Sequence, residues 1–278
     1  MTTTENPAVG QDIVANGIRT NYHEAGTAEE TVVLIHGSGP GVTAYANWRL
    51  VIPALAENFH VLAPDMVGFG YSDRPADVKY GLDTWANQTI AFIEEKGIKK
   101  AHLIGNSFGG SIALRIATLR PDLVDRLVLM GSMGVYFPIT EGLDNVWGYN
   151  GTIEDMRSVL DFFAYNRNLV NEELAQVRYR DSSQPGWQEG FSSMFPAPRQ
   201  RWVEALMTPE EDIKALKNRT LILHGREDKV IPLSTSLRLE ELIDDADLCV
   251  FAHCGHWSMI ERTADFNRLV RDFFLSGK

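Results

Sequence analysis

This sequence of 278 residues has few cysteines, no net positive charge and no long apolar run. Its two cysteines, Cys249 and Cys254, lie too close along one strand-like segment to frame a disulfide scaffold. The net charge of −11 and the lack of a basic stripe argue against nucleic acid and an anionic membrane as partners. No apolar run approaches a transmembrane helix, and residues 1–6 have no signal-peptide features, so we expect a cytoplasmic protein.

A zinc site could be imagined where His253 and His256 flank Cys254. Together with Cys249 these side chains would lie along one extended strand and point to alternate faces, so we expect no metal. The composition, 44% hydrophobic and 23% charged, is that of a soluble globular enzyme. The length allows one large α/β domain with an insertion, or two small domains.

The most informative stretch is Gly105-Asn106-Ser107-Phe108-Gly109-Gly110. An apolar β-like run, residues 101–104, leads into it, and an apolar helical pattern, residues 111–117, leads out. A G-x-S-x-G turn between a strand and a helix is the nucleophile elbow of α/β hydrolases. The glycines at 105 and 109 leave room for a turn too tight for bulky side chains. A Gly-rich loop that merely contains serine is the alternative, and the strand and helix around it favour the elbow.

Strands and helices alternate along most of the chain. Asn16-Gly17 predicts a hairpin, and further strands are expected at 31–35, 60–64, 101–104, 126–130, 220–224 and 248–251. Helices are expected at 47–57, 83–95, 111–117, 233–243 and 263–274. This alternation predicts an α/β fold, the α/β-hydrolase fold with a mostly parallel, eight-stranded, doubly wound sheet. Function should sit at the carboxyl ends of its strands.

The alternation breaks between about residues 135 and 210. This segment shows no buried strand but has many aromatic side chains and helical patches at 152–163, 171–179 and 198–206. An aromatic-rich helical insertion in an α/β chain indicates a lid over the active site. We therefore expect a core of residues 1–134 and 211–278 and a helical cap of residues 135–210. A partner-binding helical domain is the alternative.

Ser107 needs a base, because a neutral hydroxyl is a poor nucleophile. Of the seven histidines, His256 lies in a Gly-flanked loop after the last strand, from which it can reach the elbow. His253 is the alternative. The third member should be an acid between the serine and the histidine in chain order. Asp228 follows a strand and fits this place, with its neighbour Glu227 as the rival.

The oxyanion-hole donors are expected to be the backbone N–H groups of Ser38 and Phe108. Ser38 lies in the loop of residues 36–41, which follows the strand at 31–35 as the oxyanion loop of an α/β hydrolase follows its third strand. This loop lacks G-x-G-x-x-G spacing and a Walker lysine, so a phosphate cradle is disfavoured. His36 is expected to orient the loop.

Once these residues are placed, the chain resembles the meta-cleavage product hydrolases, the C–C bond hydrolases of bacterial aromatic degradation. The specific matches are the Ser-Gly-Pro-Gly loop, Ala46-Asn47-Trp48, Asn106 and Cys254-Gly255-His256-Trp257. Residues 141–149 and 195–202 match as well, so the resemblance covers nearly the whole chain. Within the family it is most similar to the 2-hydroxymuconate-semialdehyde hydrolases, and nearly as similar to those acting on alkyl-substituted ring-fission products.

The resemblance implies a small anionic substrate, a 2-hydroxy-6-oxo-2,4-dienoate, cleaved to 2-hydroxypenta-2,4-dienoate and a short carboxylic acid. It implies no cofactor, because the C2 carbonyl of the substrate accepts the electrons of the broken bond. Ser107 attacks directly or activates water, and the sequence leaves both routes open. A homodimer or higher homo-oligomer is the family expectation. A carboxylesterase and a low-turnover small-molecule receptor on the same fold are the alternatives.

Candidate substrate contacts fall into two groups. The polar dienoate end is expected against Asn47, Asn106 and Trp257, and the apolar end against Leu143, Trp147, Val203 and Val230. Relatives that act on aryl substrates carry an arginine whose place falls near Asp212 here. Arg199 or Arg201 is therefore the expected anchor of the substrate carboxylate.

Overall fold

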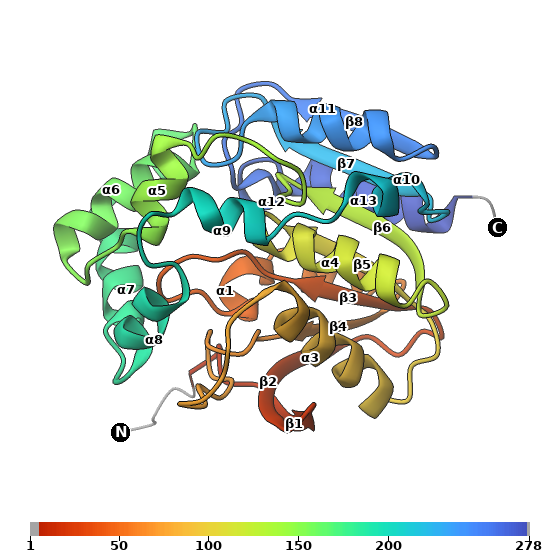
Figure 1. Ribbon diagram of the computed structural model, residues 1–278, viewed down its shortest axis with the longest axis horizontal. Helices are drawn as coiled ribbons and strands as arrows, with labels where there is room; N and C mark the ends of the chain where they lie inside the picture. The colour runs from red at the N-terminus through yellow and green to blue at the C-terminus, as the bar shows by residue number, and fades with distance from the viewer. Residues whose placement is uncertain (1–5, 277–278) are drawn as a thin grey trace.

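The computed structural model describes residues 6–276. Residues 1–5, which make up most of the N-terminal segment where we expect no signal peptide, lie outside the described residues. At its centre is an eight-stranded sheet of order β1-β2-β4-β3-β5-β6-β7-β8 (Figure 1). The strands are β1 Gln11–Ala15, β2 Ile18–Ala25, β3 Thr31–Ile35, β4 His60–Pro64, β5 Ala101–Asn106, β6 Val124–Met130, β7 Thr220–Gly225 and β8 Ala246–Phe251. The pairs β1–β2 and β2–β4 are antiparallel and the others parallel, which confirms the expected sheet.

Helices cover both faces of this sheet, as its fully buried central strands β3, β5 and β7 require. One layer is a chain of contacts from α3 through α4 and α10 to α11, and the other joins α2, α12 and α13 (Figure 1). These helices are α2 Ile52–Leu55, α3 Leu82–Glu95, α4 Phe108–Leu119, α10 Glu210–Lys214, α11 Leu233–Leu242, α12 Ser258–Glu261 and α13 Thr263–Leu275. Within residues 6–276, no helix is both long and apolar enough to cross a membrane.

The single helix expected at 47–57 is wrong, because two short helices stand there: α1 Ala44–Trp48 and α2 Ile52–Leu55. Thr43 caps α1, since its hydroxyl accepts a hydrogen bond from the Ala46 N–H (2.9 Å), and this moves the start forward. Pro53 lies in the first turn of α2. Proline has no N–H to donate to the preceding turn, so one helix cannot run through this position.

Between β6 and β7 the chain forms a helical insertion without strands over its whole length, residues 135–210. Its helices are α5 Glu141–Trp147, α6 Ile153–Phe163, the 3₁₀ turn η1 Arg167–Leu169, α7 Glu172–Ser182, α8 Trp187–Met194 and α9 Gln200–Ala205. The expected patches match α6, α7 and α9, whereas α5 and α8 are additional short helices. Figure 1 shows α5 to α8 gathered at one end of the sheet.

An aromatic cluster joins the helical insertion to the core. Phe108, next to Ser107, lies edge-on to Trp85 (4.7 Å between ring centroids) and contacts Phe195 of the insertion (6.4 Å). Phe69 of the core likewise contacts Phe191 of α8 (6.4 Å). Buried aromatic pairs of this kind contribute about 0.5–1.5 kcal/mol each beyond their area. The insertion is therefore held directly over the elbow.

Candidate active site

Ser107 occupies a strained turn at the end of β5. Its backbone has φ 55° and ψ −115°, in the region that L-residues rarely adopt, and its N-terminal position on α4 leaves the side chain above the sheet. The flanking glycines are required by space: a Cβ at Gly105 would lie 2.4 Å from the Gly109 carbonyl oxygen. A Cβ at Gly109 would lie 2.2 Å from the carbonyl oxygen of Ile35. The sequence pattern thus matches the geometry of an elbow.

His256 and Asp228 form a buried hydrogen-bonded pair, with 2.7 Å between Nδ1 and Oδ2. The other Asp228 oxygen accepts the N–H groups of Val230 (2.8 Å) and Ile231 (2.9 Å). Burial acts to raise the pKa of Asp228, but the neighbouring His256 and these hydrogen bonds outweigh it and hold the pKa below its usual value. A carboxylate only accepts, so Nδ1 of His256 carries the proton and Nε2 remains available.

The rival residues lie elsewhere. Glu227 accepts the Cys254 N–H (3.0 Å) and pairs with Arg226. His253 faces the hydroxyl of Tyr165 (3.3 Å) and does not line the cavity described below. Burial raises the pKa of the Cys254 thiol to about 12, so it is protonated at neutral pH. Across residues 6–276, no three His, Cys, Asp or Glu side chains are arranged to hold a metal ion.

The loop of residues 36–41 is fixed by His36. The backbone N–H of Met66 donates to Nε2 (3.0 Å), so Nδ1 carries the proton and donates to the Gly37 carbonyl oxygen (2.8 Å). Burial lowers the pKa of His36 to about 4, which keeps the ring neutral. As expected, His36 orients the loop. Within residues 6–276, the N–H groups of Ser38 and Phe108 donate to no protein acceptor, as the expected oxyanion-hole donors must.

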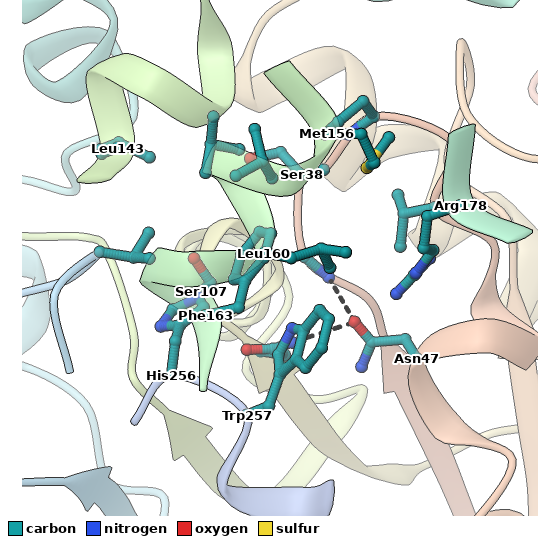
Figure 2. A pocket seen from close by; sticks show the side chains of 18 residues that line it. Ser38, Asn47, Ser107, Leu143, Met156, Leu160, Phe163, Arg178, His256 and Trp257 are labelled. Atoms are coloured by element: carbon teal, nitrogen blue, oxygen red, sulfur yellow. Dashed lines mark hydrogen bonds between the residues drawn. The ribbon is translucent and has the colours of Figure 1, made fainter. Parts of the chain in front are cut away.

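A small cavity extends from Ser107 and His256 under the helical insertion (Figure 2). Its apolar wall consists of Val42, Leu143, Val146, Met156, Val159, Leu160, Phe163 and Val230. The cavity volume is about 30 Å³, room for one or two water molecules. A dienoate therefore fits only when side chains of this wall move. Five of the residues that were expected from the sequence to contact the substrate line this cavity: Asn47, Asn106, Trp257, Leu143 and Val230.

Two amide side chains present unused polar atoms at this cavity. Oδ1 of Asn47 accepts from Nδ2 of Asn106 (3.0 Å) and from the Gly37 N–H (3.3 Å). Nδ2 of Asn47 and Oδ1 of Asn106 are buried and have no protein partner within residues 6–276. Unpaired buried polar atoms are costly, so one donor and one acceptor are set out for a polar ligand.

Arg178 of α7 is the cation of the cavity, and sequence reasoning missed it. Its guanidinium points into the cavity and lies beside Asn47 and Trp257, at the end opposite Ser107 and His256 (Figure 2). It stands 5.5 Å from the ring centroid of Trp257, and no carboxylate of residues 6–276 lies within 4 Å. Burial lowers the pKa of Arg178. Arg178 lies three residues after buried Ala175 and four before buried Ser182, so it shares the inward face of α7, which the sequence alone does not reveal.

Four of the candidate residues lie away from the cavity. Trp147 stacks on Phe195 (4.4 Å, 8° between planes) and donates to the Ser38 hydroxyl (3.0 Å), so it supports the loop of residues 36–41 without lining the cavity. Val203 is buried in α9 outside the lining. The arginines are also occupied elsewhere: Arg199 with Asp144 (3.2 Å) and Arg201 with backbone carbonyls of residues 196 and 197.

The sheet, the elbow and the Asp–His pair define a class. The alpha/beta hydrolase fold family matches residues 30–263, so the chain is an α/β hydrolase. The 2-hydroxymuconate semialdehyde hydrolase of Pseudomonas sp. strain CF600 is 57% identical over 96% of this chain and 94% of its own. The 2-hydroxy-6-oxo-2,4-heptadienoate hydrolase of Pseudomonas putida is 52% identical over 98% of both.

A solved structure leads to the same family. The meta-cleavage product hydrolase of Pseudomonas fluorescens IP01, a mutant complexed with acetates, superimposes with a TM-score of 0.97. It is 57% identical, and the match covers 98% of this chain and all of the other. The chain belongs to the meta-cleavage product hydrolases.

Proposed function

We propose that this protein hydrolyses the C5–C6 bond of 2-hydroxy-6-oxo-2,4-dienoates, namely 2-hydroxymuconate semialdehyde or its alkyl-ketone analogues. One observation carries the proposal: one cavity has Ser107 and His256 at one end and, at the other, Arg178, which has no carboxylate partner among residues 6–276. A nucleophile and a fixed cation at opposite ends suit a substrate with a carboxylate at one end and a ketone or aldehyde at the other. The names of the relatives at 57% and 52% identity support the substrate class.

The polar end of the substrate binds between Arg178 and the two asparagines. A guanidinium that is partly desolvated forms strong, bidentate hydrogen bonds with a carboxylate. Nδ2 of Asn47 donates to the carboxylate or the C2 oxygen, and Oδ1 of Asn106 accepts from the 2-hydroxyl, which satisfies both orphaned atoms. Arg178 and Met156 have long, flexible side chains that can move to make room. The C6 carbonyl then lies at Ser107.

The first chemical step moves a proton. The substrate loses the proton of its 2-hydroxyl and gains one at C5, with His256 as the proton carrier. The product is a 2,6-diketone that retains the C3=C4 double bond. Asp228 holds the His256 ring in the tautomer that presents Nε2 and stabilises its cation. The step is needed because a carbon–carbon bond breaks only if the departing carbon can hold negative charge.

The second step breaks the carbon–carbon bond. The Ser107 hydroxyl, or water that it and His256 activate, adds to C6, and the N–H groups of Ser38 and Phe108 hold the resulting oxyanion. Collapse breaks C5–C6, and its electron pair moves through C3=C4 onto the C2 oxygen. Protonation gives 2-hydroxypenta-2,4-dienoate. When Ser107 itself is the nucleophile, water then hydrolyses the ester that it forms with the C6 fragment. By either route the C6 fragment leaves as a carboxylic acid, one water is consumed and no external electron acceptor is involved.

The domain arrangement is part of the same proposal. Residues 135–210 act as a cap over a core of residues 1–134 and 211–278. What supports a cap is that the segment provides Leu143, Phe163 and Arg178 to the cavity. A homodimer or higher homo-oligomer and a cytoplasmic location complete the proposal.

Two substrates test the proposed reaction. We expect purified protein to bleach a yellow ring-fission product rapidly and to hydrolyse p-nitrophenyl acetate slowly. Fast ester hydrolysis without bleaching would instead identify a carboxylesterase. Binding of the ring-fission product with negligible turnover would identify a receptor.

Two variants then separate the steps. Ser107→Ala should bind the coloured dienolate and alter its spectrum without releasing 2-hydroxypentadienoate, because His256 can still move protons. His256→Ala should slow the spectral change itself and also release no product. Stopped-flow absorbance and product analysis measure both. Full product release by Ser107→Ala would overturn the assignment of the elbow.

A further inference from the structure

A second hollow adjoins the cavity on the outside of the molecule. Its walls come from α1, the turn η1, α7 and α12, and it includes Ala46, Arg49, Leu174 and Val177. Arg178 and Trp257 line both spaces. These two side chains, with the guanidinium 5.5 Å from the indole centroid, therefore lie between the cavity and the outer hollow.

Arg49 and Arg178 share a property that sets them apart. Within residues 6–276, each other arginine has an ion pair within 4 Å or a side-chain hydrogen bond. Arg49 and Arg178 have neither, and both lie at the same hollow. Arg49 is the exposed residue that caps the C-terminus of α1 and Arg178 is half-buried on α7, so the two guanidinium groups lead from solvent toward the cavity.

We propose that this hollow is the vestibule by which the anionic substrate reaches the cavity, with Arg49 receiving its carboxylate before Arg178 does. The inference rests on the proposed function and adds a route to it. The cavity has room for one or two waters, so a dienoate fits only when a lining side chain moves aside. Arg178 is the long, flexible side chain on the dividing wall, so its movement toward an arriving carboxylate both opens the wall and binds the ligand.

Charge explains why a separate receiving residue is useful. The chain carries a net charge of −11, so its surface as a whole repels an anion. In the hollow, Glu173 and Asp181 of α7 balance the two arginines, so the local formal charge is zero. Removal of Arg49 would leave this approach negative.

The association rate of the ring-fission product tests the vestibule. It is measured by stopped-flow in a Ser107→Ala background, where binding is seen without cleavage. Arg49→Glu should slow association about 10-fold at low salt, and the deficit should shrink to less than about 2-fold at 0.5 M salt. Arg271→Glu on α13 makes the same charge change outside the hollow and should stay within about 2-fold of its parent. Equal rates for the two charge reversals would overturn the proposal.

Filling the hollow gives an independent, salt-insensitive test. Ala46→Trp on α1 and Val177→Trp on the opposite wall should each slow association at least about 10-fold at both salt concentrations, because steric blockage is not screened. Circular dichroism checks that each variant is folded, and two variants from opposite walls keep the test valid if one is not. Association at the parental rate in a folded, filled variant would show that the substrate enters elsewhere. Failure of the parent to bind at all would count against the proposed function instead.

Discussion

The carbonyl oxygen of Phe163 accepts the backbone N–H of His256 (2.8 Å) and also that of Trp257 (3.2 Å). The Phe163 ring stacks on both side chains, at 5.7 Å and 4.8 Å between centroids. Phe163 ends α6 of the helical insertion, whereas His256 belongs to the core. The position of the histidine loop is therefore set partly by the insertion that covers it.

Phe163→Leu should loosen this loop while leaving its backbone hydrogen bonds in place. Loss of the two ring contacts should lower the free energy of unfolding by about 1–2 kcal/mol and lower kcat, because the His256 ring is less restrained. Phe162→Leu, at the next position of α6, is the matched control and should leave kcat near wild type. Steady-state kinetics and urea unfolding measure both effects. An equal fall in kcat for the two variants would contradict a specific role of Phe163.

Asp228→Asn should leave the fold intact and lower kcat by about 10⁴-fold, because the amide favours the wrong tautomer of His256. Glu227→Gln should have little effect, since the Glu227 carboxylate contacts the Cys254 N–H and Arg226. The comparison uses steady-state turnover, with circular dichroism as the check on folding. A large loss in Glu227→Gln combined with near wild-type Asp228→Asn would exchange the two assignments.

Leu143→Ala should widen the end of the cavity that receives the group on C6. Discrimination against larger groups should relax by about 1–3 kcal/mol, seen in kcat/KM ratios for formyl, methyl-ketone and phenyl-ketone substrates. Met156→Ala removes a similar volume near Arg178, on the other side of the cavity (Figure 2), and should leave these ratios unchanged. Trp147 donates to the Ser38 hydroxyl and does not line the cavity, so Leu143 is the residue to change. Parallel changes in both variants would mean that general loosening, and not position, sets the selectivity.

His36→Gln should flatten the pH dependence of stability. Burial lowers the pKa of His36 from 6.5 to about 4 in the folded protein. The contribution of neutral His36 to the free energy of unfolding is therefore complete above pH 6.5. This contribution decreases by about 3 kcal/mol as the pH falls from 6.5 toward 4. Asp65, whose pKa burial raises to about 6, acts in the opposite direction, but it is present in both proteins and cancels. Unfolding curves from pH 7.5 to 4 test this, and parallel losses in the two proteins would contradict it.

Local chemistry explains what could be predicted. The elbow is a strand, a turn and a helix in one stretch, so its glycines reveal the strain around Ser107 without any tertiary information. Asp228 and His256 follow adjacent parallel strands, whose carboxyl ends meet at one edge, and the structure brings them to 2.7 Å. The strands were predictable because their buried, β-branched runs leave few alternatives. The catalytic roles stay predictions.

What could not be predicted depends on how the insertion docks. The density of aromatic side chains indicated a lid, but not which of them line the cavity, and Trp147 stacks on Phe195 instead. Nothing in the local sequence says which arginine turns inward, and Arg199 is used up by Asp144 while Arg178 is not. Pro53 was a local signal against a single helix at 47–57, and the apolar periodicity hid it.

The shared hydrogen bonds of Phe163 have a consequence for chimeric enzymes. An exchange of residues 135–210 between two such hydrolases would transfer more than a specificity wall. It would also replace the Phe163 carbonyl oxygen that accepts the His256 N–H, and the Arg178 guanidinium that lines the same cavity as His256. Recombination at these boundaries thus separates the His256 loop from the carbonyl group that accepts its backbone hydrogen bonds. We expect a chimera to keep this arrangement only if Phe163 and Arg178 come from the same parent as the core.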